Sequence, residues 1–119
     1  MHEVGVVRSM CKTVSEYAES NNVSNVAEIV CLCGELSLVI PKYVEEFFRP
    51  VADEFPALKD TRLIIEIIPG FAECEVCDDI FNVVEHEGYC PSCGSFEKNI
   101  LSGKDFLIKE THVKGSGTN

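Results

Sequence analysis

Two pairs of cysteines constrain this chain more than any other feature of its sequence. Cys74 and Cys77 form one CxxC pair, Cys90 and Cys93 form another, and twelve residues separate the two pairs. Two intervening residues allow both sulfurs of a pair to reach one ion, and two such turns complete a tetrahedral four-cysteine shell. Four protein ligands leave no open coordination position, so we expect a structural zinc site and not a catalytic one.

Three other interpretations of these cysteines are weaker. The chain holds seven cysteines, and an odd number cannot pair completely in disulfides. A redox CxxC normally opens a helix of a thioredoxin-like unit, and no such pattern surrounds these residues. If the cysteines were buried without a metal, apolar burial alone would have to stabilise this short module, which is too small for that. Structural zinc contributes roughly 10–16 kcal/mol of apparent folding free energy, which removes that difficulty.

Acidic residues are concentrated around the cysteine pairs. The range 70–103 holds seven acidic residues and one basic residue, and the whole chain has a formal net charge of −10. Affinity for nucleic acid comes from neutralising phosphates, so we expect neither nucleic acid nor an anionic membrane surface as a partner. The shift in composition also predicts that this range is a separate module.

Apolar residues before the module predict two helices. Steps of three and four residues from Val7 to Ala18 mark one apolar helical face, and Asn21-Asn22 should end that helix. Pro41 is typical of the first turn of a second helix. Pro50 should stop or kink the second helix, because proline lacks an N–H and clashes with the preceding turn.

Three segments have the composition of strands. The ranges 26–32 and 63–68 are rich in β-branched and apolar residues, and 105–113 alternates between apolar and polar residues. The order helix, strand, helix, strand, module, strand predicts an α+β fold. In this fold two helices pack on a small three-stranded sheet, with an inserted zinc-ribbon module.

We therefore expect three parts in the chain. Residues 1–69 plus 104–113 form an α+β domain, and residues 70–103 form a zinc-ribbon domain with four cysteine ligands. Residues 114–119 are small and polar and predict a disordered tail.

Two kinds of signal are absent from the sequence. The chain begins without a signal-peptide pattern and has no apolar run that could span a membrane, so we expect a cytoplasmic location. No nucleophile–base–orienter set can be assembled, and there is no Walker loop. We therefore expect a binding protein and not an enzyme.

The first two residues offer a second metal site. A retained Met1 places a terminal amine, the amide nitrogen of His2 and the His2 imidazole Nδ1 in fused chelate rings. Nitrogen-rich, nearly planar ligand sets favour Ni(II) or Cu(II). A solvated terminal histidine is the ordinary alternative at this position.

Five segments of the chain resemble the HypA/HybF family. These are Met1-His2-Glu3, Gly34–Pro41, Leu63–Cys74, Cys90–Ser95 and Ile100–Glu110. They occur in the family's order and spacing, and the resemblance covers residues 1 to about 112. Members of this family are nickel metallochaperones that mature [NiFe]-hydrogenases and, in some organisms, urease.

The resemblance implies a role for each candidate ligand. It implies that His2 binds Ni2+ as transient cargo, assisted by the Met1 amine and the Glu3 main-chain amide, so that the α+β domain is the nickel-binding domain. It implies structural Zn2+ at Cys74, Cys77, Cys90 and Cys93. The implied partners are a HypB-type GTPase and the hydrogenase large subunit, with urease accessory proteins as further candidates and a homodimer left open.

The chain departs from the family pattern in three places. Asp78 stands where glycine is common, Arg49-Pro50 interrupts the second helix, and Cys31 and Cys33 replace aliphatic residues. Cys31 and Cys33 share a strand face and are either buried thiols or an extra soft-metal or redox pair.

The remaining cysteine and histidines have ordinary structural explanations, and for one of them a role as a metal ligand stays open. Cys11 falls on the apolar helix face and should be part of the core, and His112 should be a surface residue at a strand end. His86 is either a solvated loop residue or a further metal ligand. A zinc-ribbon adaptor without nickel is the alternative function, and a small metal-dependent hydrolase is a third class that the closed four-cysteine shell disfavours.

Overall fold

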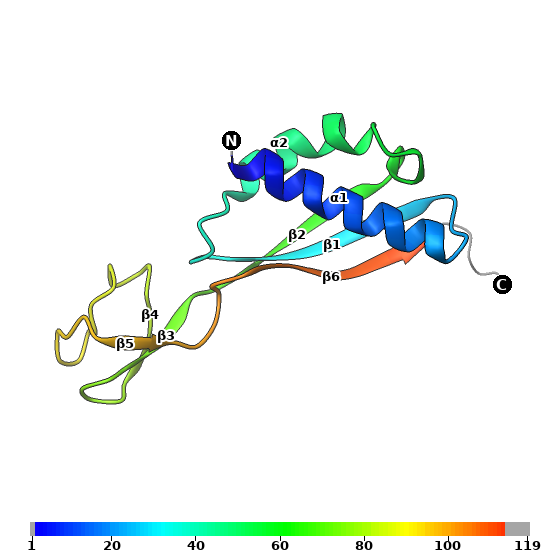
Figure 1. Cartoon of the computed structure of the whole chain (residues 1–119). Helices are drawn as coiled ribbons and strands as arrows, with labels where there is room; N and C mark the ends of the chain where they lie inside the picture. Colours follow the sequence, from blue (N-terminus) through cyan, green and yellow to red (C-terminus); the bar gives the residue numbers. More distant parts are fainter. Residues whose placement is uncertain (1, 114–119) are drawn as a thin grey trace. The chain divides into compact units, whose positions relative to one another are not determined.

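The computed structural model of this chain describes residues 2–113, with the backbone alone at His2 (Figure 1). Met1 and the predicted tail 114–119 lie outside the described residues. The elements follow in the order α1 (His2–Ser20), β1 (Val26–Gly34), α2 (Pro41–Ala52), the 3-10 helix η1 (Pro56–Leu58), β2 (Arg62–Ile68), β3 (Phe71–Cys74), β4 (Ile80–Asn82), β5 (Lys98–Ile100) and β6 (Phe106–Val113).

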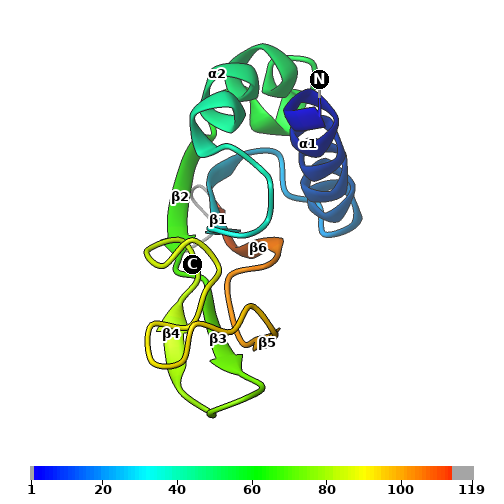
Figure 2. The same ribbon diagram turned by 90° about the vertical axis from the view of Figure 1, so that its left-hand side faces the viewer.

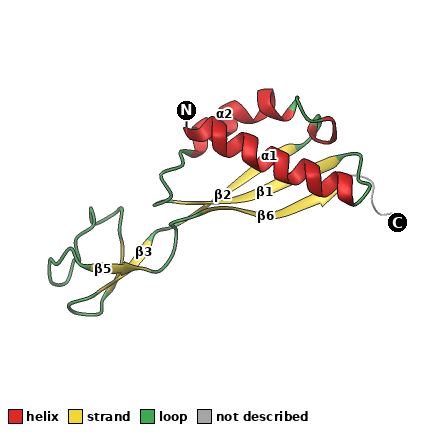
Figure 3. Ribbon diagram, in the orientation of Figure 1, coloured by secondary structure: helices red, strands yellow, loops and turns green. Residues whose placement is uncertain are grey.

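The strands form two sheets of three. One sheet has the order β2-β1-β6, and α1 and α2 lie together on one of its faces (Figure 3). The other has the order β4-β3-β5, with both pairs antiparallel (Figure 2). The predicted α+β fold, two helices on a three-stranded sheet with an inserted cysteine module, is confirmed.

The chain divides into two compact units. Within the described residues, the first unit comprises residues 2–31, 39–66 and 107–113, and the second comprises residues 32–38 and 67–106. The predicted module range 70–103 therefore lies within the second unit. The segment 32–38, which the sequence assigns to the first domain, belongs to the second unit by its contacts.

The core of the first unit is apolar and draws on several elements. Val7 of α1, Ile29 of β1, Val44 of α2 and Leu58 of η1 are all fully buried. Cys11 is also fully buried, as its place on the apolar face of α1 predicts. Burial of side chains of this size stabilises a fold by roughly 1.5–3 kcal/mol each relative to exposure.

Helix α2 continues past Pro50 to Ala52. The sequence predicts that Pro50 stops or kinks this helix; the stop is wrong, and the kink stays a prediction. Proline removes one backbone hydrogen bond, and near the last turn of a helix little of the hydrogen-bond ladder remains to be lost. The neighbouring Arg49 donates to the carbonyl oxygens of Leu58 at 2.6 Å and Thr61 at 2.9 Å, which anchors this end of α2 on the segment around η1. No sequence pattern indicates η1, which lies between α2 and β2.

Two glycines bring the segment 32–38 against the rest of the second unit. A Cβ atom on Gly34 would lie 2.0 Å from the carbonyl oxygen of Gly103, so the two backbones pass in direct contact. The amide of Leu36 donates to that same carbonyl oxygen at 2.8 Å. The carboxylate of Glu35 accepts from the amide of Gly70 at 2.9 Å. These contacts explain why a segment distant in sequence joins the cysteine module.

None of the helices described within residues 2–113 is long and apolar enough to cross a membrane.

Candidate metal centre

The four cysteines of the two CxxC pairs converge at one point in the second unit. The Sγ atoms of Cys74 and Cys93 are 3.6 Å apart, and those of Cys77 and Cys90 are 3.5 Å apart. All four sulfurs lie within 4.8 Å of one another. A tetrahedral zinc ion with Zn–S bonds of about 2.3 Å holds its sulfurs roughly 3.8 Å apart. The cluster is therefore able to bind a metal, and its donor set and spacing fit a tetrahedral ion.

Each CxxC pair is held in a tight turn by backbone hydrogen bonds. In the first turn the amide of Asp78 donates to the carbonyl of Cys74 at 3.0 Å, and the amide of Cys74 donates to the carbonyl of Asp79 at 2.8 Å. The second turn repeats the pattern, with the amide of Gly94 donating to the carbonyl of Cys90 at 2.8 Å. The two turns thus present their sulfurs in equivalent ways.

The residue after each CxxC pair has a left-handed backbone. Gly94 has a φ of 80° and Asp78 a φ of 67°. Glycine adopts this conformation without strain, whereas aspartate adopts it at a cost that its short polar side chain reduces. The left-handed backbone at Asp78 gives a physical reason for the glycine that is common at this position.

Backbone amides point at the sulfur of the first ligand. The pKa of Cys74 is lowered to about 7, chiefly because the amide of Cys77 donates to its sulfur, with the amide of Val76 assisting at 3.3 Å. Burial of the thiol acts in the opposite direction. The thiolate is the form that binds metal, so these amides favour the ligand state of Cys74.

A side-chain contact that the sequence does not predict links the two turns. The hydroxyl of Ser92 donates to the carboxylate of Asp79 at 2.6 Å. Ser92 lies inside the second CxxC pair and Asp79 follows the first, so the bond connects the two halves of the cluster. Groups outside the ligand shell commonly orient metal ligands, and this is the role the contact suits.

The cluster is half buried. Cys74 and Cys90 are buried, whereas Cys77 and Cys93 are exposed. Ala72 and Phe81 join the two buried ligands in a small core. Half of the residues in this core are therefore candidate metal ligands.

The predicted nickel site lies at the limit of the described residues. Helix α1 begins at His2, while Met1 and the His2 side chain are outside the described part of the chain. Glu3 is nine-tenths buried, and its carboxylate accepts from the amide of Ile40 at 3.3 Å, at the start of α2. The first four amides of an α-helix have no acceptor within the helix, and the main-chain amide of Glu3 is among these.

The other sulfur candidates are buried, as thiols at those positions are expected to be. The thiol of Cys31 donates to the thioether sulfur of Met10 at 3.2 Å, and Cys33 lies 3.9 Å from the hydroxyl of Ser37. Their alternative use as a soft-metal or redox pair stays a prediction.

The described metal-binding group contains four cysteines and neither His86 nor His112. The His86 ring packs edge-on against Phe81, with ring centroids 6.2 Å apart. His112 is exposed on β6, between the carboxylates of Glu28 at 3.1 Å and Glu110 at 3.2 Å. The sequence places His112 at the surface but gives no sign of its two carboxylate partners.

Known proteins share both the sequence and the architecture of this chain. Residues 1–113 match the family model described as "Hydrogenase/urease nickel incorporation, metallochaperone, hypA". The chain is 37% identical over 110 residues to the hydrogenase maturation factor HypA of Francisella philomiragia, covering 92% of this chain and 96% of the relative. It is 32% identical over 114 residues to HypA of Aquifex aeolicus, covering 96% and 98%.

Solved structures share the fold of this chain. The nickel metallochaperone HypA of Helicobacter pylori superposes with a TM-score of 0.67 at 24% identity, covering 93% of this chain and 96% of that one. A second HypA solution structure gives a TM-score of 0.69 at 26% identity, covering 95% and 96%. The resemblance that the sequence motifs suggest is confirmed, and this chain belongs to the HypA family of nickel-incorporation metallochaperones.

Proposed function

We propose that this chain binds Ni(II) at its N-terminus, binds zinc at its four clustered cysteines, and passes the nickel on during hydrogenase maturation. Membership of the HypA family carries the proposal, because nickel incorporation is the activity by which that family is described. Delivery to urease belongs to the same proposal.

The nickel ligands proposed are the terminal amine of Met1, the amide and imidazole nitrogens of His2, and the amide nitrogen of Glu3. Nickel favours such nitrogen-rich planar sets. The start of α1 at His2 supports this arrangement, because amides in the first turn are not committed to helical acceptors. The Glu3 carboxylate is already bonded to the amide of Ile40, so Glu3 would contribute through its main chain.

The proposed transfer is a ligand exchange, not a catalysed reaction. A terminal site can release its ligands one at a time to an acceptor, which a closed cage of four side chains cannot do easily. The energy for directional delivery would come from a partner, and a HypB-type GTPase suits that need. The hydrogenase large subunit would be the recipient, in the cytoplasm.

Zinc at the cysteine cluster would be structural. The shell of four thiolates leaves no open position, so the ion neither activates water nor exchanges readily. It would supply the folding free energy that the small core around Ala72 and Phe81 lacks. The sulfur–sulfur distances of 3.5 and 3.6 Å support this assignment.

Calorimetric titration of Ni(II) into the untagged, zinc-loaded chain tests the nickel site. We expect one equivalent to bind to the parent and to be lost in His2→Ala. His86→Ala is the matched control, since it removes a histidine from the second unit, and it should bind as the parent does. Equal binding by the parent and His2→Ala would contradict the proposed ligands. Failure of all three proteins to bind nickel would favour the zinc-ribbon adaptor.

A further inference from the structure

Two aromatic rings lie exposed side by side on the second unit. Tyr89 and Phe96 have 54% and 57% of their surfaces exposed. Their ring centroids are 5.1 Å apart, and the ring planes are tilted by 58°. Large aromatic side chains are ordinarily covered, and an exposed contacting pair is typical of a binding surface.

The second metal-binding turn creates this pair. Tyr89 directly precedes Cys90, and Phe96 directly follows Ser95. The amide of Cys90 donates to the carbonyl of Ser95 at 2.9 Å, which closes the turn and brings the two aromatic residues opposite one another. The same fold that positions a metal ligand therefore positions the rings.

Neighbouring residues hold the Phe96 ring in place. A Cβ atom on Gly88 would lie 2.8 Å from this ring, so the ring packs directly on the Gly88 backbone. The ammonium of Lys98 lies 3.4 Å from the ring centroid and also donates to the carbonyl of Phe96 at 2.9 Å. A ring fixed in this way loses little conformational entropy when a partner covers it.

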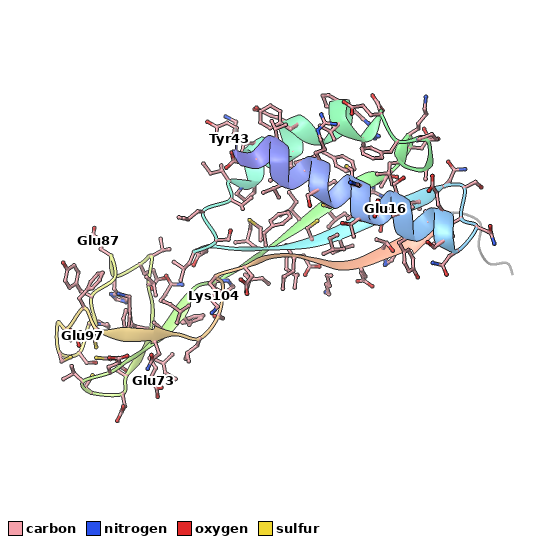
Figure 4. All side chains as sticks on the ribbon, viewed as in Figure 1. Glu16, Tyr43, Glu73, Glu87, Glu97 and Lys104 are labelled. Atoms are coloured by element: carbon pink, nitrogen blue, oxygen red, sulfur yellow. The ribbon has the colours of Figure 1, made fainter. Side chains whose placement is uncertain are left out.

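The surroundings of the two rings are strongly acidic. Residues 32–38 and 67–106 together hold nine acidic and two basic residues, a formal charge of −7. A bound metal would leave further negative charge, because four thiolates outweigh one divalent ion. Glu87 and Glu97 lie close to the rings in sequence, and both belong to this module (Figure 4).

We propose that Tyr89 and Phe96 form a docking surface for a basic segment of a partner protein. Arginine suits this surface, since its planar guanidinium stacks on aromatic faces and its charge complements the surrounding carboxylates. Nucleic acid does not suit it, because its phosphates would be repelled by the same carboxylates. Lys98 already covers one face of Phe96, which leaves the Tyr89 ring as the main contact.

This surface is independent of nickel binding at the N-terminus. A peptide probe can therefore test it on zinc-loaded chain without nickel. The probe is a synthetic peptide in which arginine and leucine alternate between glycine spacers, titrated into the 15N-labelled full chain. We expect saturable shifts of the amide signals of residues 84–98. We also expect the affinity for the peptide to fall as the salt concentration is raised, since salt screens exposed charges.

Matched variants separate docking on the rings from general attraction to an acidic protein. Tyr89→Ala/Phe96→Ala should weaken peptide affinity by about tenfold or more, the change expected when aromatic hot-spot residues are lost. Tyr17→Ala removes a tyrosine of α1 with 57% exposure and should leave the affinity unchanged. A peptide with glutamate in place of arginine should not bind.

Each variant is also prepared with Co(II) in place of zinc. A variant that keeps the absorption of a four-thiolate Co(II) site still folds around its metal. If the double alanine variant loses this absorption, Tyr89→Leu/Phe96→Leu replaces it, since leucine keeps apolar bulk but has no ring face. Unchanged affinity in the folded variant would overturn the proposal. Shifts that map to α1 or α2, binding of single-stranded DNA in place of the peptide, or self-association through these rings in sedimentation would overturn it equally.

Discussion

The first unit buries Val7, Ile29, Val44 and Leu58 from four different elements, whereas the core cluster around Cys74 and Cys90 in the second unit is small. In the first unit, the core consists of side chains whose contribution is their apolar surface. In the second unit, half of the core cluster consists of residues whose sulfurs converge on a common point. If the proposed zinc is bound at these sulfurs, the two units of one short chain depend on different sources of stability.

The difference follows from how much surface each unit can bury. Two helices on a sheet cover one another over many residues, while three strands of three or four residues cover little. Small domains commonly compensate with a metal or with disulfides. The first unit should therefore tolerate loss of the metal, and the second should not.

Removal of the metal should have the largest effect and should fall on one unit alone. Cys74→Ala, or chelation of the parent, should abolish the fold of residues 67–106, because on the order of 10 kcal/mol of metal-coupled folding free energy is lost. Amide spectra should show collapse of those signals and retention of the α1 and α2 signals. Cys11→Ala is the control, since it removes a buried cysteine outside the cluster and should leave the metal content unchanged. Unfolding of both units together would contradict the comparison.

Truncation of an apolar core side chain should destabilise the first unit and leave the second unit intact. Ile29→Ala removes a fully buried side chain and should lower the free energy of unfolding of the first unit by about 2–5 kcal/mol. Urea unfolding followed by helix circular dichroism measures the change, and the zinc content should stay at its parent value. Leu107→Ala, at a position with 54% exposure, should change the stability by less than about 0.5 kcal/mol. A loss of zinc from Ile29→Ala would show that the units are coupled.

The two CxxC turns allow a finer test within the second unit. Gly94 has open space around its missing Cβ, so Gly94→Ala should cost only the left-handed backbone strain, about 1–2 kcal/mol. Asp78→Gly should relieve strain of the same kind and stabilise the unit by up to about 1 kcal/mol. Competition with a chelator of known affinity measures both changes as shifts in zinc affinity. The two substitutions should change the zinc affinity in opposite directions. A change in the same direction would contradict the equivalence of the two turns.

A pH-dependent ion pair should make the smallest contribution, and it belongs to the first unit. The pKa of His112 is raised above its ordinary value of 6.5, chiefly because Glu110 accepts a hydrogen bond from its ring, with Glu28 assisting. A raised pKa in the folded state means that the contribution is fully present below 6.5 and is lost as the pH rises through the folded-state pKa. Titration of the His112 ring protons should therefore give a midpoint above 6.5, and Glu110→Gln should lower it.

Glu16→Gln serves as the control for that titration, because it removes a carboxylate from α1 and should leave the His112 midpoint unchanged. A His112 midpoint at or below 6.5 in the parent would contradict the expected direction.

Periodic patterns in the sequence predict most of the first unit. Helix periodicity and β-branched composition locate α1, β1, α2, β2 and β6, because burial of one face imposes these patterns on the residues themselves. The pattern does not show that α2 continues past Pro50 to Ala52, where the side chain of Arg49 bonds to carbonyls of residues beyond the helix. A contact of this kind, between two separate segments, produces no local pattern in the sequence.

Residue spacing predicts the ligands of the cysteine cluster but not their surroundings. A CxxC pair must be short to reach one ion, so the constraint is visible in the sequence. The bond between Asp79 and Ser92 joins two turns thirteen positions apart, with residue types that are common on any surface. The exposed pair of Tyr89 and Phe96 is likewise invisible, because its partners meet only once the second turn has closed.

The contact between Gly34 and Gly103 restricts how sequences of this fold can diverge. At most close contacts, a larger side chain at one position can be offset by a smaller one at the other. Here the obstacle to a Cβ atom on Gly34 is the backbone of Gly103, which no substitution can make smaller. Gly103 is restricted separately, because its φ is 81° and a Cβ atom on it would lie 2.7 Å from the carbonyl oxygen of Pro69. Substitution is therefore blocked at each position independently. Two glycines far apart in sequence should therefore persist together in chains that keep this crossing, even where the surrounding residues have changed beyond recognition.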